Sequence, residues 1–173
     1  MNISSDSQLE LLIEVYFDGL CRPINPGGIA CYAFVVKSNG KTIHSEYGIA
    51  VEPFSNDATN NVAEYTALIK ALEWLVANNH SSSKVRITGD SELIVNQQNG
   101  NSKVKSRRIL PLFRQVHLLK DKFLEVDIRH VPREENREAD RLTNLAYKEF
   151  LRNNSEYQDR IIESEIEKKT SRL

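Results

Sequence analysis

The feature that most constrains the fold is a series of three short apolar runs, separated by turn signals, near the start of the chain. In the first run apolar and polar side chains alternate, which is typical of a half-buried strand. The dipeptide Asn39-Gly40 between the second and third runs is a strong signal for a two-residue β-hairpin. The runs therefore predict an antiparallel meander. Its strands are residues 11–17, 29–37 and 41–51, with a Pro- and Gly-rich turn at 19–28.

After the meander the chain alternates between helical and strand-like patterns. Apolar residues from Tyr65 to Val76 recur at helical spacing and predict an amphipathic helix. The order of elements predicts an α/β (α+β) fold in three layers, with a five-stranded mixed sheet flanked by helices. The predicted elements are a helix at 61–79, a strand at 84–88, a helix at 91–98, a helix at 107–123 with Pro111 in its first turn or at a kink, a strand at 124–131 and a last helix over about 139–150.

Length and composition favour a single folded domain. A chain of 173 residues with 40% hydrophobic residues can bury a core without disulfide or metal support. We expect residues 11–153 to form that domain. Residues 1–10 are polar and predict a short flexible lead. Residues 154–173 alternate in charge and predict either a docked helix or a loose tail.

Charge and cysteine content set the expected surroundings of the protein. Lys+Arg 23 against Asp+Glu 24 leaves the chain almost neutral, so any binding of a polyanion must depend on a local basic patch. The two cysteines, Cys21 and Cys31, do not form a dense disulfide framework, which favours a reduced compartment. Neither a membrane-spanning stretch of about 20 apolar residues nor a signal peptide is apparent. We expect a soluble, cytoplasmic monomer without a membrane partner.

Four carboxylates stand out from this background. Taken singly, each has a structural explanation, because Asp18 can form a turn, Asp90 can cap a helix and Asp140 can lie on a solvated helix face. Glu64 follows Asn61 by three residues, the spacing of a capping box.

The combination favours a site. Three of the four acids fall at the end of a predicted strand or at the start of the helix that follows one, where clefts form in open sheets. If the first and fourth strands are neighbours, Asp18 and Asp90 come side by side. Four like charges so close would repel each other unless cations held them together. An oxygen-rich site of this kind suits Mg²⁺ or Mn²⁺ rather than zinc.

The sequence around these acids resembles that of ribonuclease HI, particularly the compact form common in archaea. The resemblance covers about residues 11–150 and implies the ribonuclease H-like fold. It depends on four motifs in the family's order and approximate spacing: Phe-Asp-Gly at 17–19, Thr-Asn-Asn-Val-Ala-Glu-Tyr at 59–65, Gly-Asp-Ser at 89–91, and the segment from His130 to Asp140.

The resemblance implies an activity and a role for each acid. Ribonucleases of this family hydrolyse the RNA strand of RNA/DNA hybrids endonucleolytically and leave 5′-phosphate and 3′-hydroxyl ends. By motif, Asp18 would bridge two Mg²⁺ ions, with Mn²⁺ as a substitute. Glu64 and Asp90 would hold the ion beside the leaving group, and Asp140 the ion that carries the attacking water. His130, ten residues before Asp140, would assist turnover; otherwise it is a strand-end histidine without a chemical task.

The resemblance also suggests residues that contact the substrate. Polar side chains at a helix start can bind a DNA phosphate and the minor groove of the hybrid, although Asp57 departs from the arginine of some relatives. A basic cluster at 103–108 can bind further phosphates, although a solvated helix face would also explain it. The predicted substrate-binding residues are Gly19, Thr59, Asn60, Asn61, Lys103, Lys105, Arg107 and Arg108.

Two rival functions remain open at this point. One is a catalytically idle nucleic-acid-binding module on the same fold, although all four acids are present. The other is a different enzyme of the polynucleotidyl-transferase superfamily, such as a DNA-strand nuclease or a domain of a reverse transcriptase. Double-stranded RNA is a possible additional substrate.

Overall fold

The structure is a computed structural model that describes residues 12–170. The polar lead predicted at residues 1–10 lies outside the described residues, so that prediction stays untested. Among residues 12–170, no helix is both long enough and apolar enough to cross a lipid bilayer.

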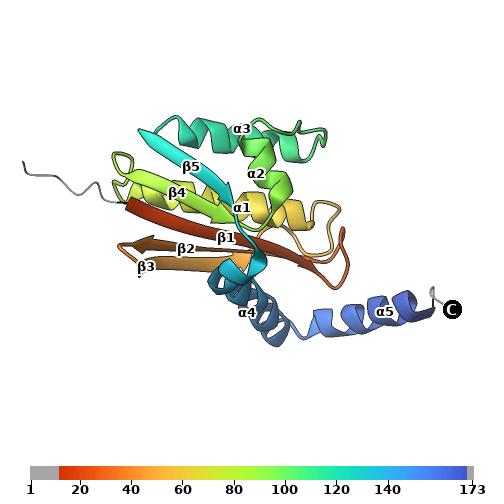
Figure 1. Ribbon diagram of the computed structural model, residues 1–173. Helices are drawn as coiled ribbons and strands as arrows, with labels where there is room; N and C mark the ends of the chain where they lie inside the picture. The colour runs from red at the N-terminus through yellow and green to blue at the C-terminus, as the bar shows by residue number, and fades with distance from the viewer. Residues whose placement is uncertain (1–11, 171–173) are drawn as a thin grey trace, which may run out of the picture.

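A five-stranded mixed sheet forms the centre of the molecule (Figure 1). Its spatial order is β3-β2-β1-β4-β5. The first three strands pair antiparallel, and β4 and β5 extend the sheet in parallel from β1. The predicted meander and five-stranded mixed sheet are therefore confirmed. The strands are β1 (Leu12–Arg22), β2 (Ile29–Ser38), β3 (Lys41–Ile49), β4 (Lys84–Gly89) and β5 (Glu125–His130).

Helices cover both faces of the sheet and complete the three predicted layers (Figure 1). On one face α1 packs against β1 and β2 and is itself in contact with α3. On the other face α4 crosses β1, β2 and β3. The helices are α1 (Asn60–Ala77), α2 (Glu92–Gln98), α3 (Ile109–Lys120), the short 3₁₀ turn η1 (Arg133–Glu135), α4 (Arg137–Asn153) and α5 (Glu156–Thr170).

The main core lies between β1 and α1. Ile13, Val15 and Phe17 are buried on one face of β1, as their alternation predicts, and they share a hydrophobic cluster with Leu68 and Leu72 of α1. Intervening residues of β1 face α4 instead. The apolar residues that recur every second position in β1 thus pack against those that recur at helical spacing in α1.

The structure corrects the predicted bounds of two elements. β1 continues four residues beyond Asp18, because its antiparallel register with β2 runs on until Arg22 pairs with Ile29. The predicted turn at 19–28 is correspondingly shorter. Helix α3 begins at Ile109, which places Pro111 in its first turn, where a missing N–H costs no helical hydrogen bond.

Residues 156–170 form helix α5. Its first turns dock on the body of the protein, since Ile161 is buried and Tyr157 stacks on both Phe54 and Phe150. Figure 1 shows the rest of α5 leading away from the sheet. The boundary at residue 154 stays a prediction.

Candidate active site

The parallel pairing of β1 with β4 places two of the predicted acids side by side. The register between these strands ends at Tyr16 opposite Thr88, two residues before Asp18 and Asp90. Asp18 is buried, with 7% of its surface exposed. Burial and the nearby negative charge of Asp90 both raise the pKa of its carboxyl group. The adjacency of the first and fourth strands, which the sequence left conditional, therefore holds.

The third acid comes from α1, whose first turn lies directly over β1. A Cβ atom on Gly19 would fall 2.3 Å from the backbone nitrogen of Glu64, so only glycine allows this close approach. Thr59 caps α1, because its hydroxyl oxygen accepts a hydrogen bond from the Val62 N–H at 3.1 Å. The capping box of Asn61 with Glu64 is therefore wrong. The helix begins one residue earlier than predicted, and Glu64 lies beyond the N3 position.

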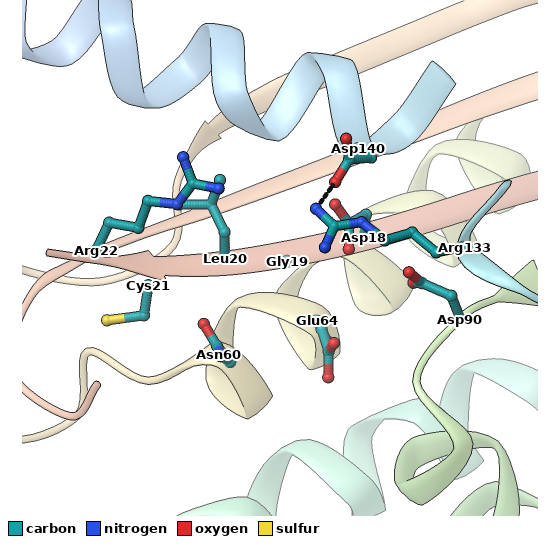
Figure 2. Close-up of a pocket in the computed structure, with 10 residues that line it drawn as sticks. All are labelled: Asp18, Gly19, Leu20, Cys21, Arg22, Asn60, Glu64, Asp90, Arg133 and Asp140. Carbon is teal, nitrogen blue, oxygen red and sulfur yellow. Dashed lines mark hydrogen bonds and ion pairs between the residues drawn. The ribbon is translucent and has the colours of Figure 1, made fainter. Parts of the chain in front are cut away.

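The fourth acid reaches the site from the opposite face of the sheet. Asp140 lies in the first turns of α4, and its carboxylate accepts a hydrogen bond from the guanidinium of Arg133 on η1. One turn further along α4, the Thr143 hydroxyl donates to Asp18 Oδ2 at 2.9 Å. Figure 2 shows Asp140 on one side of β1 and Glu64 on the other.

All four acids line a single cleft of about 270 Å³. They come from four separate elements, since Asp90 lies in the turn between β4 and α2. Arg22 of β1 and Asn60 at the start of α1 add polar side chains to the wall, so the cleft suits a charged ligand. Its lining is Asp18, Gly19, Leu20, Cys21, Arg22, Asn60, Glu64, Asp90, Arg133 and Asp140 (Figure 2).

Burial and mutual repulsion raise the pKa values of two of the carboxyl groups. Burial first, and then the neighbouring Asp90, raise the pKa of Asp18 to about 6. Burial raises the pKa of Glu64 to about 8, although a hydrogen bond with the Ser91 side chain lowers it in part. The pKa of Arg133 is also raised, by its hydrogen bond to Asp140 and by the charges of Asp18 and Asp90. Such raised carboxyl pKa values indicate a site that gains from a bound cation.

The donor set fits a hard divalent cation, but the side chains are not arranged around one. Within residues 12–170, no three acidic, histidine or cysteine side chains are gathered closely enough to hold a metal ion. The guanidinium of Arg133 donates a hydrogen bond to Asp140 Oδ1. Figure 2 shows the carboxylate of Glu64 directed away from Asp18. Oxygen ligands alone suit Mg²⁺ or Mn²⁺. Binding of an ion by all four acids would require Glu64 to turn toward Asp18 and would compete with the ion pair between Arg133 and Asp140 Oδ1.

A second polar pocket of about 200 Å³ lies beside the start of α1. Thr59 and Asn61 line it, whereas Asn60 lines the carboxylate cleft, so the first turn of the helix borders both. Arg108 also lines this pocket, and its Nε donates to Asp57 Oδ1 at 2.7 Å. A guanidinium from the segment before α3 is therefore held at this pocket by its ion pair with Asp57.

The remaining predicted site residues lie outside the carboxylate cleft. Lys103, Lys105 and Arg107 are exposed between α2 and α3. Arg107 and Arg108 together line a neighbouring groove. His130 is the last residue of β5, exposed and opposite Gly89, and it is not among the described residues that line the cleft. Its assisting role stays a prediction.

Besides Thr143 and several lining residues of β1, two residues that contact the acids were not predicted. Arg133 lines the cleft, and Asn136 donates a hydrogen bond to Asp90 Oδ1 at 3.2 Å. Both lie in the segment before α4, which the sequence marks only as a charged loop. Their one signal is an offset of seven and four residues before Asp140, and its meaning depends on how the loop folds back over β1.

Comparisons with known proteins agree with this geometry. The sequence profile of a family described as "Reverse transcriptase-like" matches residues 27–146. The chain is 34% identical to a ribonuclease HI of Halobacterium salinarum over 144 residues, which cover 78% of this chain and 63% of that protein. The solved RNase H1 of that organism superposes with a TM-score of 0.69 at 31% identity, over 80% of this chain and 98% of the other.

The chain belongs to the ribonuclease HI family. The solved RNase H structures confirm the expected fold. The N-terminal RNase H domain of a Mycobacterium tuberculosis protein is a second neighbour, with a TM-score of 0.72, 30% identity and coverage of 83% of this chain and 98% of that domain. A third is LC11-RNase H1, solved in complex with an RNA/DNA hybrid, with a TM-score of 0.72, 36% identity and coverage of 80% and 99%.

Some relatives in the ribonuclease HI family are much longer than the segment they share with this chain. A "bifunctional protein" of Mycobacterium tuberculosis is 37% identical over 138 residues, which cover 80% of this chain but 35% of that protein. The chain thus spans about a third of the length of this curated relative.

Proposed function

We propose that this chain is an endoribonuclease that hydrolyses the RNA strand of RNA/DNA hybrids. The observation that carries the proposal is the single cleft lined by four carboxylates from β1, α1, the β4–α2 turn and α4. Its solved relative LC11-RNase H1 was captured with an RNA/DNA hybrid, which supports the choice of substrate.

The carboxylates would hold two Mg²⁺ ions, with Mn²⁺ as a substitute. Asp18 would be shared by both ions, Glu64 and Asp90 would bind one, and Asp140 the other. Ions held by these residues would supply activation of the attacking water and charge neutralisation at the leaving 3′-oxygen, and we expect 5′-phosphate and 3′-hydroxyl ends. The carboxylates need not carry protons themselves. Thr143 keeps Asp18 oriented through its hydrogen bond to Oδ2.

The second pocket would receive a phosphate of the DNA strand. Backbone N–H groups at the start of α1 and the hydroxyl of Thr59 offer donors, and Arg108 offers a positive charge. Because Asn60 and Asn61 line the two pockets from one helical turn, a hybrid can contact both at once. Lys103, Lys105 and Arg107 would bind phosphates further along the duplex.

A cleavage assay tests the proposal. Labelled RNA/DNA hybrid, double-stranded RNA and DNA duplex are each incubated with Mg²⁺, Mn²⁺ or excess chelator. We expect the hybrid to be cut with either metal and not in chelator. Deoxyribonucleotides placed at the cut site should block cleavage there, because the 2′-hydroxyl distinguishes RNA from DNA.

Other outcomes assign the chain differently. Equal cutting of DNA duplex would indicate a DNA nuclease, and tight binding of hybrid without cleavage under any metal would indicate an idle binding module. Cleavage that persists in chelator would exclude the two-ion mechanism. The double-stranded RNA arm decides whether that duplex is an additional substrate.

A further inference from the structure

Asn136 is a buried polar residue that contacts one of the four acids of the cleft. It lies between η1 and α4, and only 1% of its surface is exposed. Asparagine is usually exposed, because burial of its amide costs free energy unless the amide is hydrogen-bonded. A fully buried amide beside a carboxylate cleft therefore calls for a physical explanation.

The Asn136 side chain joins two segments just beyond the point where the parallel pairing of β1 with β4 ends. Its Nδ2 donates to the Phe17 carbonyl oxygen at 2.8 Å and to Asp90 Oδ1 at 3.2 Å. Both partners can only accept, so the orientation of the amide is determined by its neighbours. The parallel register of β1 with β4 ends at Tyr16 and Thr88, immediately before these contacts. The amide thus continues the connection between β1 and β4 at the level of the carboxylates.

The Asn136 backbone also contacts the segment that carries the fourth acid, Asp140. Its carbonyl oxygen accepts a hydrogen bond from the Asp140 N–H at 3.1 Å, in the first turn of α4. Phe17 directly precedes Asp18 in β1. One residue therefore contacts Asp90 itself, the backbone next to Asp18, and the helical turn that carries Asp140.

A purely structural role as a helix cap does not account for these contacts. Asn136 occupies the N-cap position of α4, but its side chain makes no capping hydrogen bond. In addition, its Oδ1 is buried without a hydrogen-bond partner within residues 12–170. A fold optimised only for stability would satisfy that oxygen or replace the residue, because an unsatisfied buried acceptor is destabilising.

We propose that Asn136 is a positioning residue, which holds Asp90 against β1 so that Asp18 and Asp90 keep a separation suited to a shared divalent cation. The claim rests on the proposed function of the four carboxylates as metal ligands. A neutral amide suits this task, because it donates to one oxygen of Asp90 and leaves the other oxygen available. Without it, repulsion between the two carboxylates would drive them apart.

Two variants and one matched control test the proposal. Asn136→Ala removes the amide, and Asn136→Leu removes its donors while keeping a similar volume, which preserves a test if truncation prevents folding. The control is Asn99→Ala, because Asn99 likewise donates through Nδ2 to a strand carbonyl, that of Ile128 at 3.0 Å, but has no contact with the carboxylates. Mg²⁺ binding is measured by titration calorimetry on the free proteins, below their melting temperatures.

We expect both Asn136 variants to bind Mg²⁺ about 10- to 100-fold more weakly than the unaltered protein, the range seen when a partner of a metal ligand is lost. Hybrid cleavage should fall and recover in part at high Mg²⁺, whereas hybrid binding in chelator should not change. Asn99→Ala should lose stability but keep its Mg²⁺ affinity. If the Asn136 variants lose only stability and bind Mg²⁺ normally, Asn136 is structural and the proposal is wrong.

The two proposals can fail separately. If the unaltered protein binds Mg²⁺ but cuts no hybrid, the proposed function fails, while the calorimetric comparison still decides the role of Asn136. If the unaltered protein binds no Mg²⁺, both the metal site and the positioning role are excluded.

Discussion

The guanidinium of Arg133 donates a hydrogen bond to the carboxylate of Asp140, seven residues later in the chain. The short turn η1 bends the chain between them, so that Arg133 projects back into the cleft. The cationic side chain of Arg133 thus lies among three acids, Asp140, Asp18 and Asp90. These acids raise the pKa of Arg133. It partly balances charge that a divalent cation would otherwise balance.

Arg133→Ala should therefore strengthen Mg²⁺ binding while slowing cleavage. In the variant, Asp140 has no ion pair that competes with the metal ion. Because Arg133 is largely exposed, we expect a gain of only about threefold in Mg²⁺ affinity. Cleavage at saturating Mg²⁺ should fall by about tenfold, because the cleft loses a guanidinium that could stabilise negative charge on the reacting phosphate. Calorimetry and rate measurements check both effects. Arg129→Ala, which breaks another exposed Arg–Asp pair, is the control; weaker Mg²⁺ binding by Arg133→Ala would mean that Arg133 orients Asp140 for the metal.

Asp18→Asn should abolish hybrid cleavage without unfolding the protein. The amide keeps the size of the side chain and can still accept from Thr143, but it lacks the charge needed to bind two cations. Because Asp18 is buried near Asp90, loss of its charge should leave the melting temperature in chelator unchanged or raise it. Asp127→Asn is the control for an acid outside the cleft. Near-normal turnover of Asp18→Asn would show that Asp18 is not a metal ligand.

The metal-free protein should lose stability as pH rises from about 4.5 to about 8. Burial raises the pKa of Glu64 from 4.5 to about 8, so the folded state keeps a proton that the unfolded chain has released. A folded state with more bound protons is favoured at low pH, and its advantage disappears as pH passes the folded pKa. Asp18, with a pKa of about 6, adds to the effect at lower pH. From Glu64 alone the loss should be on the order of 5 kcal/mol.

Urea unfolding in chelator at several pH values measures this slope. Glu64→Gln should remove most of it above pH 6, whereas Glu73→Gln, an exposed position on the same helix, should not. Equal slopes in all three proteins would mean that Glu64 is ionised in the folded state. Mg²⁺ affinity should rise over the same pH range, because the ion binds the deprotonated carboxylates.

His130→Ala should slow turnover but leave the metal site intact. His130 is exposed at the end of β5 and does not line the cleft, so its contribution should lie at or below about 10²-fold, the lower end for general acid–base catalysis. The rate constant at saturating hybrid and the Mg²⁺ affinity are measured together. His80→Ala, which removes a histidine stacked on Trp74, provides the comparison. An unchanged rate and pH profile would leave His130 with a structural role only.

Arg108→Ala should weaken binding of hybrid and reduce its salt dependence. If Arg108 contacts one phosphate, its loss should decrease the slope of log affinity against log salt concentration by about 1. Binding is measured in chelator, over a range of salt, so that cleavage does not interfere. Lys70→Ala removes an exposed positive charge from α1 that lines neither pocket. The same slope for both variants would mean that Arg108 only pairs with Asp57.

Local sequence patterns are enough to predict most of the helices and strands, and the strand ends and helix starts at which most of the acids lie. Alternation at Ile13, Val15 and Phe17 and the helical spacing of Leu68 and Leu72 depend on local periodicity, and the structure buries these residues as predicted. Asn39-Gly40 forms the turn of the β2–β3 hairpin, with both residues at positive φ. Such features can be predicted because each depends on a few neighbouring residues.

Only the tertiary structure decided what surrounds the carboxylates. The extension of β1 to Arg22 depends on pairing with β2, and the position of Glu64 depends on how closely α1 approaches Gly19. Arg133 and Asn136 acquire their contacts because η1 folds back over β1, a path that local sequence does not encode. Hydrogen bonds and ion pairs between residues far apart in the chain depend on distances that exist only after the layers have packed, so they follow from the whole fold.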